Sequence, residues 1–222
     1  MGKKDFLKFI DKGDTLLAPK KSGFFGKFFG ITKLILGICF LPFAYSATIA
    51  FLNELSVLEK TFNYYFFSGI ISFLIIYLFI YEPAIIYNKG HKILEAAFRF
   101  FTPMLRVAPY LLPIYTIILF LLCGLFLLIN KTQDSLRYFV FLFGFSIALH
   151  LVFSAKTLRK RQNDFLKGDY IFGFSFIYIV NLAILAFGLN VLFGKFSFVN
   201  FCNNSFQIAN SIFGMLFKQL FL

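Results

Sequence analysis

Five long apolar runs constrain this chain more than any other feature of its sequence. Each is close to the roughly 20 residues that a helix needs to cross a hydrocarbon core of about 30 Å. Because unpaired backbone groups cannot face lipid, runs of this length are expected to be helical. They predict an all-α, polytopic membrane helical bundle with about five transmembrane helices. The runs lie at about residues 34–52, 64–81, 107–129, 136–155 and 170–193.

The charge of the chain supports the same class. Only 14% of residues are charged and the mean hydropathy is +0.81, whereas about a quarter of the residues are charged in a typical soluble domain. The net charge of +12 could indicate nucleic acid, but the basic residues lie in the short segments between apolar runs. Basic connections orient membrane proteins and attract anionic headgroups. We therefore expect the lipid bilayer as partner and no nucleic acid.

The distribution of lysine and arginine predicts the orientation. Residues 1–33, 82–106 and 156–169 hold 17 of them, and the connections on the opposite side hold 5. The side richer in lysine and arginine is normally cytoplasmic. The counts place the N-terminus in the cytoplasm and, with an odd number of spans, the C-terminus outside.

We expect one membrane domain with a segment at each end that lies on the membrane surface. Residues 1–33 are a basic, Phe-rich arm, residues 34–195 contain the five spans, and residues 196–222 are an interfacial segment. In the last of these, amides interrupt the apolar pattern, while Phe206, Ile212, Phe213, Leu216 and Phe217 could form the apolar stripe of an interfacial helix. A sixth span is the alternative for this segment.

The stretch from Glu82 to Thr116 holds the candidate site, because ionisable groups near membrane depth are costly and are read as functional candidates. His91 and Glu95 are four residues apart, so they share one helix face. Together with His150, from a later span at a similar depth, they could supply three ligands to zinc. The alternative has His91 paired with Glu95 or with backbone carbonyls, and His150 hydrogen-bonded to a neighbouring helix.

Two prolines lie close together at the start of the third apolar run. Pro109 and Pro113 would break two backbone hydrogen bonds in its first turns, so that the helix kinks or leaves carbonyls pointing into a cavity. We expect a shaped binding pocket beside the helix that carries His91. Its candidate binding residues are Lys92, Arg106, Pro109, Tyr110, Pro113 and Tyr115.

These residues carry a resemblance to a known family. The run from Phe73 to Glu95, followed by Val107 to Thr116, resembles the core of bacterial membrane-embedded zinc metallopeptidases of the site-2-protease type, and Gly144 to Leu158 resembles a later span of that family. In those enzymes a Gly-His-Glu-x-x-His helix precedes an Ala-Pro-Tyr-x-x-Pro-x-Tyr-Thr segment. The resemblance implies a related helical fold in a bacterial inner membrane.

The departures from the family pattern argue against the peptidase reaction. Gly90 and His91 match the motif, but Lys92 stands where the catalytic Glu would be and Glu95 where the second His would be. A protonated lysine cannot accept a proton from metal-bound water. We therefore expect no catalytic residues, no cofactor, and a non-catalytic relative that binds or scaffolds another membrane protein. The alternatives are a zinc peptidase that uses His91, Glu95 and His150, and a transporter or channel subunit.

Overall fold

The computed structural model describes residues 24–80, 83–97, 110–129, 133–160 and 168–221. All secondary structure within these ranges is helical, as the apolar runs predict. The elements are α2 (Phe24–Ser56), α3 (Lys60–Ile75), the π-helix η1 (Ile76–Ile80), α4 (Ala84–Ala97), α6 (Ile114–Ile129), α7 (Gln133–Lys160), α8 (Gly168–Leu192) and α9 (Phe198–Phe221).

Four described segments are long and apolar enough to cross a membrane: Leu34–Ser56, Lys60–Phe79, Ser135–Arg159 and Tyr170–Leu192. They correspond to four of the five predicted runs, and they make this a membrane-integrated helical protein. The remaining run is represented by α6, a shorter apolar helix of 16 residues. It is short because Leu112 and Pro113 interrupt the helix that precedes it.

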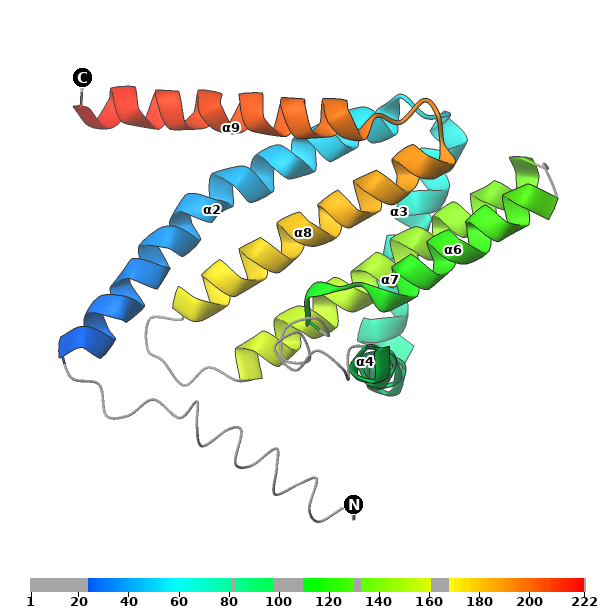
Figure 1. Ribbon diagram of the computed structural model, residues 1–222, viewed down its shortest axis with the longest axis horizontal. Coiled ribbons are helices and arrows are strands. Elements are labelled where there is room, and N and C mark those ends of the chain that lie inside the picture. The colour runs from blue at the N-terminus through cyan, green and yellow to red at the C-terminus, as the bar shows by residue number, and fades with distance from the viewer. Residues whose placement is uncertain (1–23, 81–82, 98–109, 130–132, 161–167, 222) are drawn as a thin grey trace, which may run out of the picture.

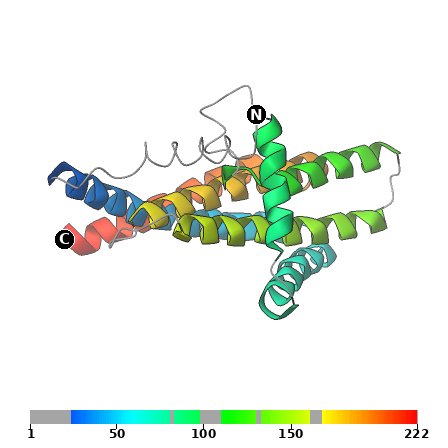
Figure 2. The same cartoon turned by 90° about the horizontal axis from the view of Figure 1, so that it is seen from below.

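One end of the bundle is formed by turns between helices, and the other carries the transverse helix α4. The turns from α2 to α3 and from α8 to α9 lie side by side at the upper right of Figure 1, and α6 ends on the same side of the bundle. At the opposite end α4 is seen end-on in Figure 1 and lies across the other helices in Figure 2. The two views agree that α4 is transverse to the bundle, which places it at an angle suited to a membrane surface.

Two glycines allow α3 and α7 to cross in backbone contact. A Cβ atom on Gly69 would lie 2.0 Å from the carbonyl oxygen of Phe141, and one on Gly144 would lie 2.1 Å from that of Phe66. Small residues at such crossings let membrane helices approach closely and gain van der Waals contact. This crossing fixes α7, which carries His150, against the helix that leads into α4.

The two terminal segments extend the predicted helices. The helix α2 begins at Phe24, so residues 24–33 of the predicted surface arm are helical and continuous with the first span, while residues 1–23 lie outside the described part of the chain. The predicted C-terminal segment forms α9, a continuous helix of 24 residues that packs against α2. Its position relative to a bilayer surface remains a prediction.

Polar contacts hold the start of α9. The buried Glu54 carboxylate accepts a hydrogen bond from the Ser197 backbone N–H at 3.1 Å. Asn190 Oδ1 accepts one from the Phe198 N–H at 3.0 Å, and Ser197 Oγ caps the Asn200 N–H at 3.2 Å. These acceptors satisfy N–H groups that a helix leaves unpaired at its first turn. The first turn of α9 is therefore anchored to both α2 and α8.

Candidate functional site

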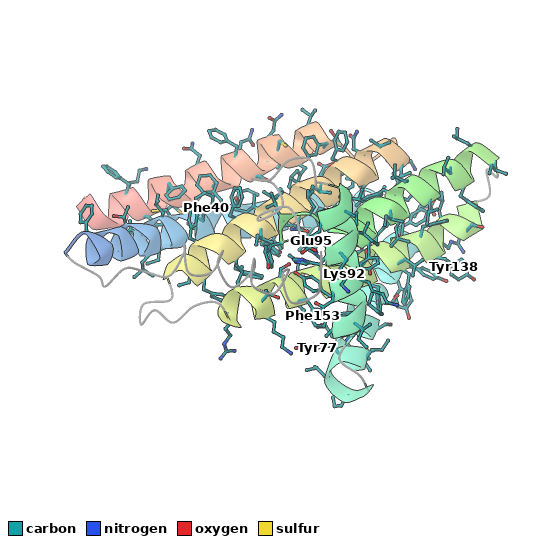
Figure 3. The ribbon with its side chains drawn as sticks, turned by 60° about the horizontal axis from the view of Figure 1, so that its bottom comes forward. Phe40, Tyr77, Lys92, Glu95, Tyr138 and Phe153 are labelled. Atoms are coloured by element: carbon teal, nitrogen blue, oxygen red, sulfur yellow. The ribbon has the colours of Figure 1, made fainter. Side chains whose placement is uncertain are left out.

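The transverse helix α4 is amphipathic, and one face is packed on the bundle. Tyr87, Gly90 and Leu94 are buried at helical spacing, whereas Lys92 and Glu95 are exposed. Figure 3 shows both of these charged side chains projecting from α4. Lys92 lies away from the buried face, as its rotation of about 100° from His91 predicts.

Gly90 allows α4 to cross the beginning of α6 closely. A Cβ atom on Gly90 would lie 2.7 Å from Tyr115 Cε2 and 2.8 Å from Ile114 Cγ2. The Tyr115 hydroxyl donates a hydrogen bond to the Ile86 carbonyl at 2.5 Å. Tyr115, a predicted binding residue, thus ties α4 to α6.

Aromatic rings pack α4 against the other helices. Phe153 of α7 stacks on Tyr87 with ring centroids 5.2 Å apart and meets Tyr77 of η1 edge-on at 5.8 Å. Figure 3 shows Phe153 and Tyr77 near the point where α4 crosses the bundle. The ring of Tyr87 is therefore held in place from the α7 side.

The predicted break before α6 is present, and it frees two carbonyl groups. In an unbroken helix the Ile114 N–H would bond to the Tyr110 carbonyl, but it bonds to the Leu112 carbonyl at 3.0 Å. The Tyr110 oxygen lies 3.1 Å from His150 Nε2 and accepts a bond from Ser154 Oγ at 3.3 Å. Asn181 Nδ2 donates to the Leu111 oxygen at 3.0 Å. The freed carbonyls therefore meet side chains of α7 and α8 and do not point into a cavity.

The Tyr110 carbonyl determines the direction of the two hydrogen bonds that it receives. A carbonyl oxygen only accepts, so both His150 Nε2 and Ser154 Oγ must donate to it. Because the Ser154 proton is directed to that carbonyl, the Ser154 oxygen can accept a hydrogen bond from the Tyr87 hydroxyl, 3.4 Å away. It also lies 3.3 Å from His150 Nε2, whose single proton is already donated to the Tyr110 oxygen. His150 and Ser154 are both buried, and both lie in the candidate span Ser135–Arg159. Their polar atoms thus satisfy the backbone of the interrupted helix, as the alternative reading of His150 predicts.

Two of the three candidate metal ligands, His91 and His150, lie beside Tyr87, and the third, Glu95, lies next to His91. His91 Nδ1 lies 3.9 Å from Glu95 Oε1, so the spacing of four residues predicted their proximity correctly. The ring of Tyr87 lies 5.3 Å from that of His91 and 6.1 Å from that of His150. The His91 ring also meets Tyr110 edge-on at 4.8 Å. An aromatic ring therefore neighbours both imidazoles.

The donor set does not fit zinc as it is arranged. Among the residues that the structure describes, no three His, Cys, Asp or Glu side chains lie close enough to hold one metal ion. The Nε2 atom of His150 faces the Tyr110 carbonyl. A structural or catalytic zinc needs at least three protein ligands directed at one point.

The remaining predicted binding residues fall into two groups. Tyr110 and Pro113 lie at the interruption before α6, next to Tyr115. Arg106 and Pro109 lie outside the described residues. Sequence reasoning missed Tyr87, Ser154 and Asn181 as members of the polar cluster. The spacing of Ser146, His150 and Ser154, four residues apart on α7, was the available signal, because it places all three on one face toward α6.

Fold and site together define a membrane-integrated helical protein with a transverse helix packed over a buried polar cluster. Comparisons with family models, with curated proteins and with solved structures find no match. The function therefore has to be argued from the site itself.

Proposed function

We propose that this chain is a non-catalytic, multi-pass membrane protein, a degenerate relative of site-2-protease-type peptidases, that binds or scaffolds another membrane protein at the junction of α4 and α6. The observation that carries the proposal is the hydrogen bonding of His150 and Ser154 to the Tyr110 carbonyl. His150 is one of the three side chains that a zinc site here would require, and its Nε2 atom is taken up by the backbone carbonyl. We place the chain in a bacterial inner membrane, with its N-terminus in the cytoplasm.

The outer face of α4 suits contact with a membrane-embedded partner. Ile85, Ile86 and Ile93 are exposed there, and the basic residues Lys89 and Lys92 are interleaved with them. Apolar side chains on a transverse helix can reach a partner within the bilayer while lysines remain at the headgroups. The packing of Gly90 against Tyr115 holds this face at a fixed angle.

Binding can be tested by site-specific photo-cross-linking in intact membranes. A photo-reactive residue at Ile93 should give a discrete adduct with a second membrane protein. The same residue at Leu128, an apolar and even more exposed position at the far end of α6, should give none. Identical adduct patterns at the two positions would remove the support for a binding face on α4.

A zinc peptidase is the second candidate, because His91 and His150 both lie beside Tyr87 and Glu95 lies next to His91. Elemental analysis of purified protein separates the two functions. We expect no stoichiometric zinc in the wild type and no change in His91→Ala, with Asn88→Ala, an exposed residue on the same helix, as control. Stoichiometric zinc that only His91→Ala loses, together with metal-dependent peptide hydrolysis, would establish the peptidase.

A further inference from the structure

A stripe of four uncharged polar residues and one glycine runs along the exposed side of α9. Its members are spaced alternately three and four residues apart, which keeps them on one helix face. No charged residue occurs between Val199 and Phe217. The stripe consists of Asn200, Asn203, Gln207, Asn210 and Gly214, all of them exposed.

The stripe faces away from the helix on which α9 packs. Phe201 and Ala209 of α9 are buried, and the Phe201 ring lies 6.5 Å from that of Phe51 on α2. Because a residue turns by about 100° from its neighbour, Asn203, Gln207 and Asn210 lie on the opposite side of α9. The stripe therefore belongs to the outer surface of the bundle.

From the contacts between α9 and α2 we infer that the stripe lies at membrane depth. Phe201 meets Phe51, and twelve residues later Phe213 meets Phe43 at 5.3 Å. At 1.5 Å per residue α9 advances by about 18 Å while its contact point moves about 12 Å along α2. A helix lying in the membrane plane would remain at one level of α2. Phe43 lies well inside the candidate span Leu34–Ser56, so α9 descends beside it. Figure 1 shows α9 starting beside the end of α2 and running back along it while the two helices diverge.

An amide stripe at this depth requires a hydrogen-bonding partner. Burying an amide in an apolar medium without a partner costs about 2 to 7 kcal/mol, depending on the reference state. Asn and Gln side chains in membrane helices commonly hydrogen-bond across to another helix. On α9 this partner must come from outside the helix pair, because the stripe points away from α2.

We propose that the partner is a second copy of this chain, and that two α9 helices pair through the stripe to form a symmetric dimer. All copies in one membrane share one topology, so a two-fold axis lies along the membrane normal and the two helices run in the same direction. Equivalent residues then meet each other across the axis. An amide carries both donors and acceptors and can bond to its own copy, whereas a charged side chain would repel its copy.

Gly214 favours close approach at the inner end of the stripe. A Cβ atom there would meet nothing within 4 Å, so its surface is open to a second helix. Alternating spacing of three and four residues is also the pattern by which parallel helices pack over several turns. The dimer goes beyond the proposed binding function, since it uses a helix remote from α4.

Cysteine cross-linking of the full-length chain in its membrane tests the dimer. The exposed Cys39 and Cys202 are replaced by Ser, while the buried Cys123 is kept. We expect oxidation to link two copies through Asn203→Cys, Gln207→Cys and Asn210→Cys. Phe206→Cys, whose native side chain is 68% exposed but lies outside the stripe, is the matched control and should remain monomeric. Equal cross-linking at Phe206 and Gln207, or none at any stripe position, overturns the proposal.

Dilution in lipid vesicles gives the second test. The double variant Gln207→Ala/Asn210→Ala should lower the association constant of fluorescently labelled copies about tenfold or more, or ~1.4 kcal/mol, as expected for loss of two interhelical amide contacts. Phe206→Ala should change it less than twofold. Unchanged energy transfer in the double variant, or a monomeric wild type, contradicts the dimer. Cross-links to a different protein at the stripe positions would assign the stripe to that partner and also contradict it.

Discussion

Removing both donors from the Tyr110 carbonyl should destabilise the protein by more than the sum of the single changes. We consider His150→Leu, which keeps most of the side-chain volume, and Ser154→Ala. Either single variant leaves one of the two donors on the carbonyl oxygen. The double variant removes both donors at membrane depth, where water does not replace them.

The distances set the expected magnitudes. The contacts from His150 and Ser154 to the Tyr110 oxygen are 3.1 and 3.3 Å long. A buried hydrogen bond contributes about 0.5 to 1.5 kcal/mol net, so each single variant should lower the free energy of unfolding by about 1 kcal/mol. The double variant adds the desolvation cost of a buried acceptor, about 1 to 3 kcal/mol. The coupling energy between the two changes should therefore be at least about 1 kcal/mol.

Denaturant unfolding of the purified protein in one detergent provides the assay. Ser68→Ala is the control for Ser154→Ala, because within the described ranges the Ser68 hydroxyl bonds to the Tyr65 carbonyl of its own helix, at 2.9 Å, and to no other helix. It should change the free energy of unfolding by less than about 0.5 kcal/mol. His150→Gln retains a donor and should recover part of the loss. Strictly additive single changes, or a double variant as stable as the wild type, would refute the shared role of the two side chains.

Three further variants test the packing around the site and the anchoring of α9. Gly144→Ala drives a Cβ to 2.1 Å from the Phe66 carbonyl oxygen and should cost about 1 to 3 kcal/mol in unfolding free energy, whereas Gly124→Ala, which meets nothing within 4 Å, should be neutral or stabilising. Gly90→Ala should lower the free energy of unfolding by less than Gly144→Ala, because the nearest atoms belong to the movable side chains of Tyr115 and Ile114. Proteolysis of α4 should be faster in this variant, and an unchanged rate would contradict the tight crossing of α4 and α6. Glu54→Ala should speed hydrogen exchange of the backbone amides at the start of α9 about tenfold, because the carboxylate accepts a hydrogen bond there and its loss should lower the local stability by ~1.4 kcal/mol. Equal exchange rates in Glu54→Ala and in a variant of the exposed Glu59 would contradict that role.

Most of the scaffold followed from the sequence, because long apolar runs have few physical solutions in a bilayer. Four runs became described helices of spanning length with bounds within a few residues of those expected. The start of α6 differed, since Pro113 cannot donate a backbone hydrogen bond and the helix stops before it. The close crossing at Gly69 and Gly144 was not predicted, because nothing in an apolar run indicates which glycine meets a backbone.

The site was predicted only in part, for a related reason. The proximity of His91 and Glu95 follows from helical spacing alone. The partner of His150 could not be deduced, because it is the backbone carbonyl of Tyr110 and a carbonyl leaves no signature in sequence. The proline pair indicated that carbonyls would be freed but not where they would point. The direction of these carbonyls is set by the packing of α7 against the interruption before α6, which the sequence does not show.

The central claim is that the imidazole of His150 donates to a backbone carbonyl and does not ligate zinc. Nitrogen-15 NMR of histidine-labelled protein in lipid tests it directly, because the chain has only two histidines and His91→Ala assigns both signals. We predict a His150 Nε2 that carries a proton, is hydrogen-bonded, and keeps its chemical shift when zinc is added. A deprotonated Nε2 whose signal moves with stoichiometric zinc, together with that of His91, would contradict the account.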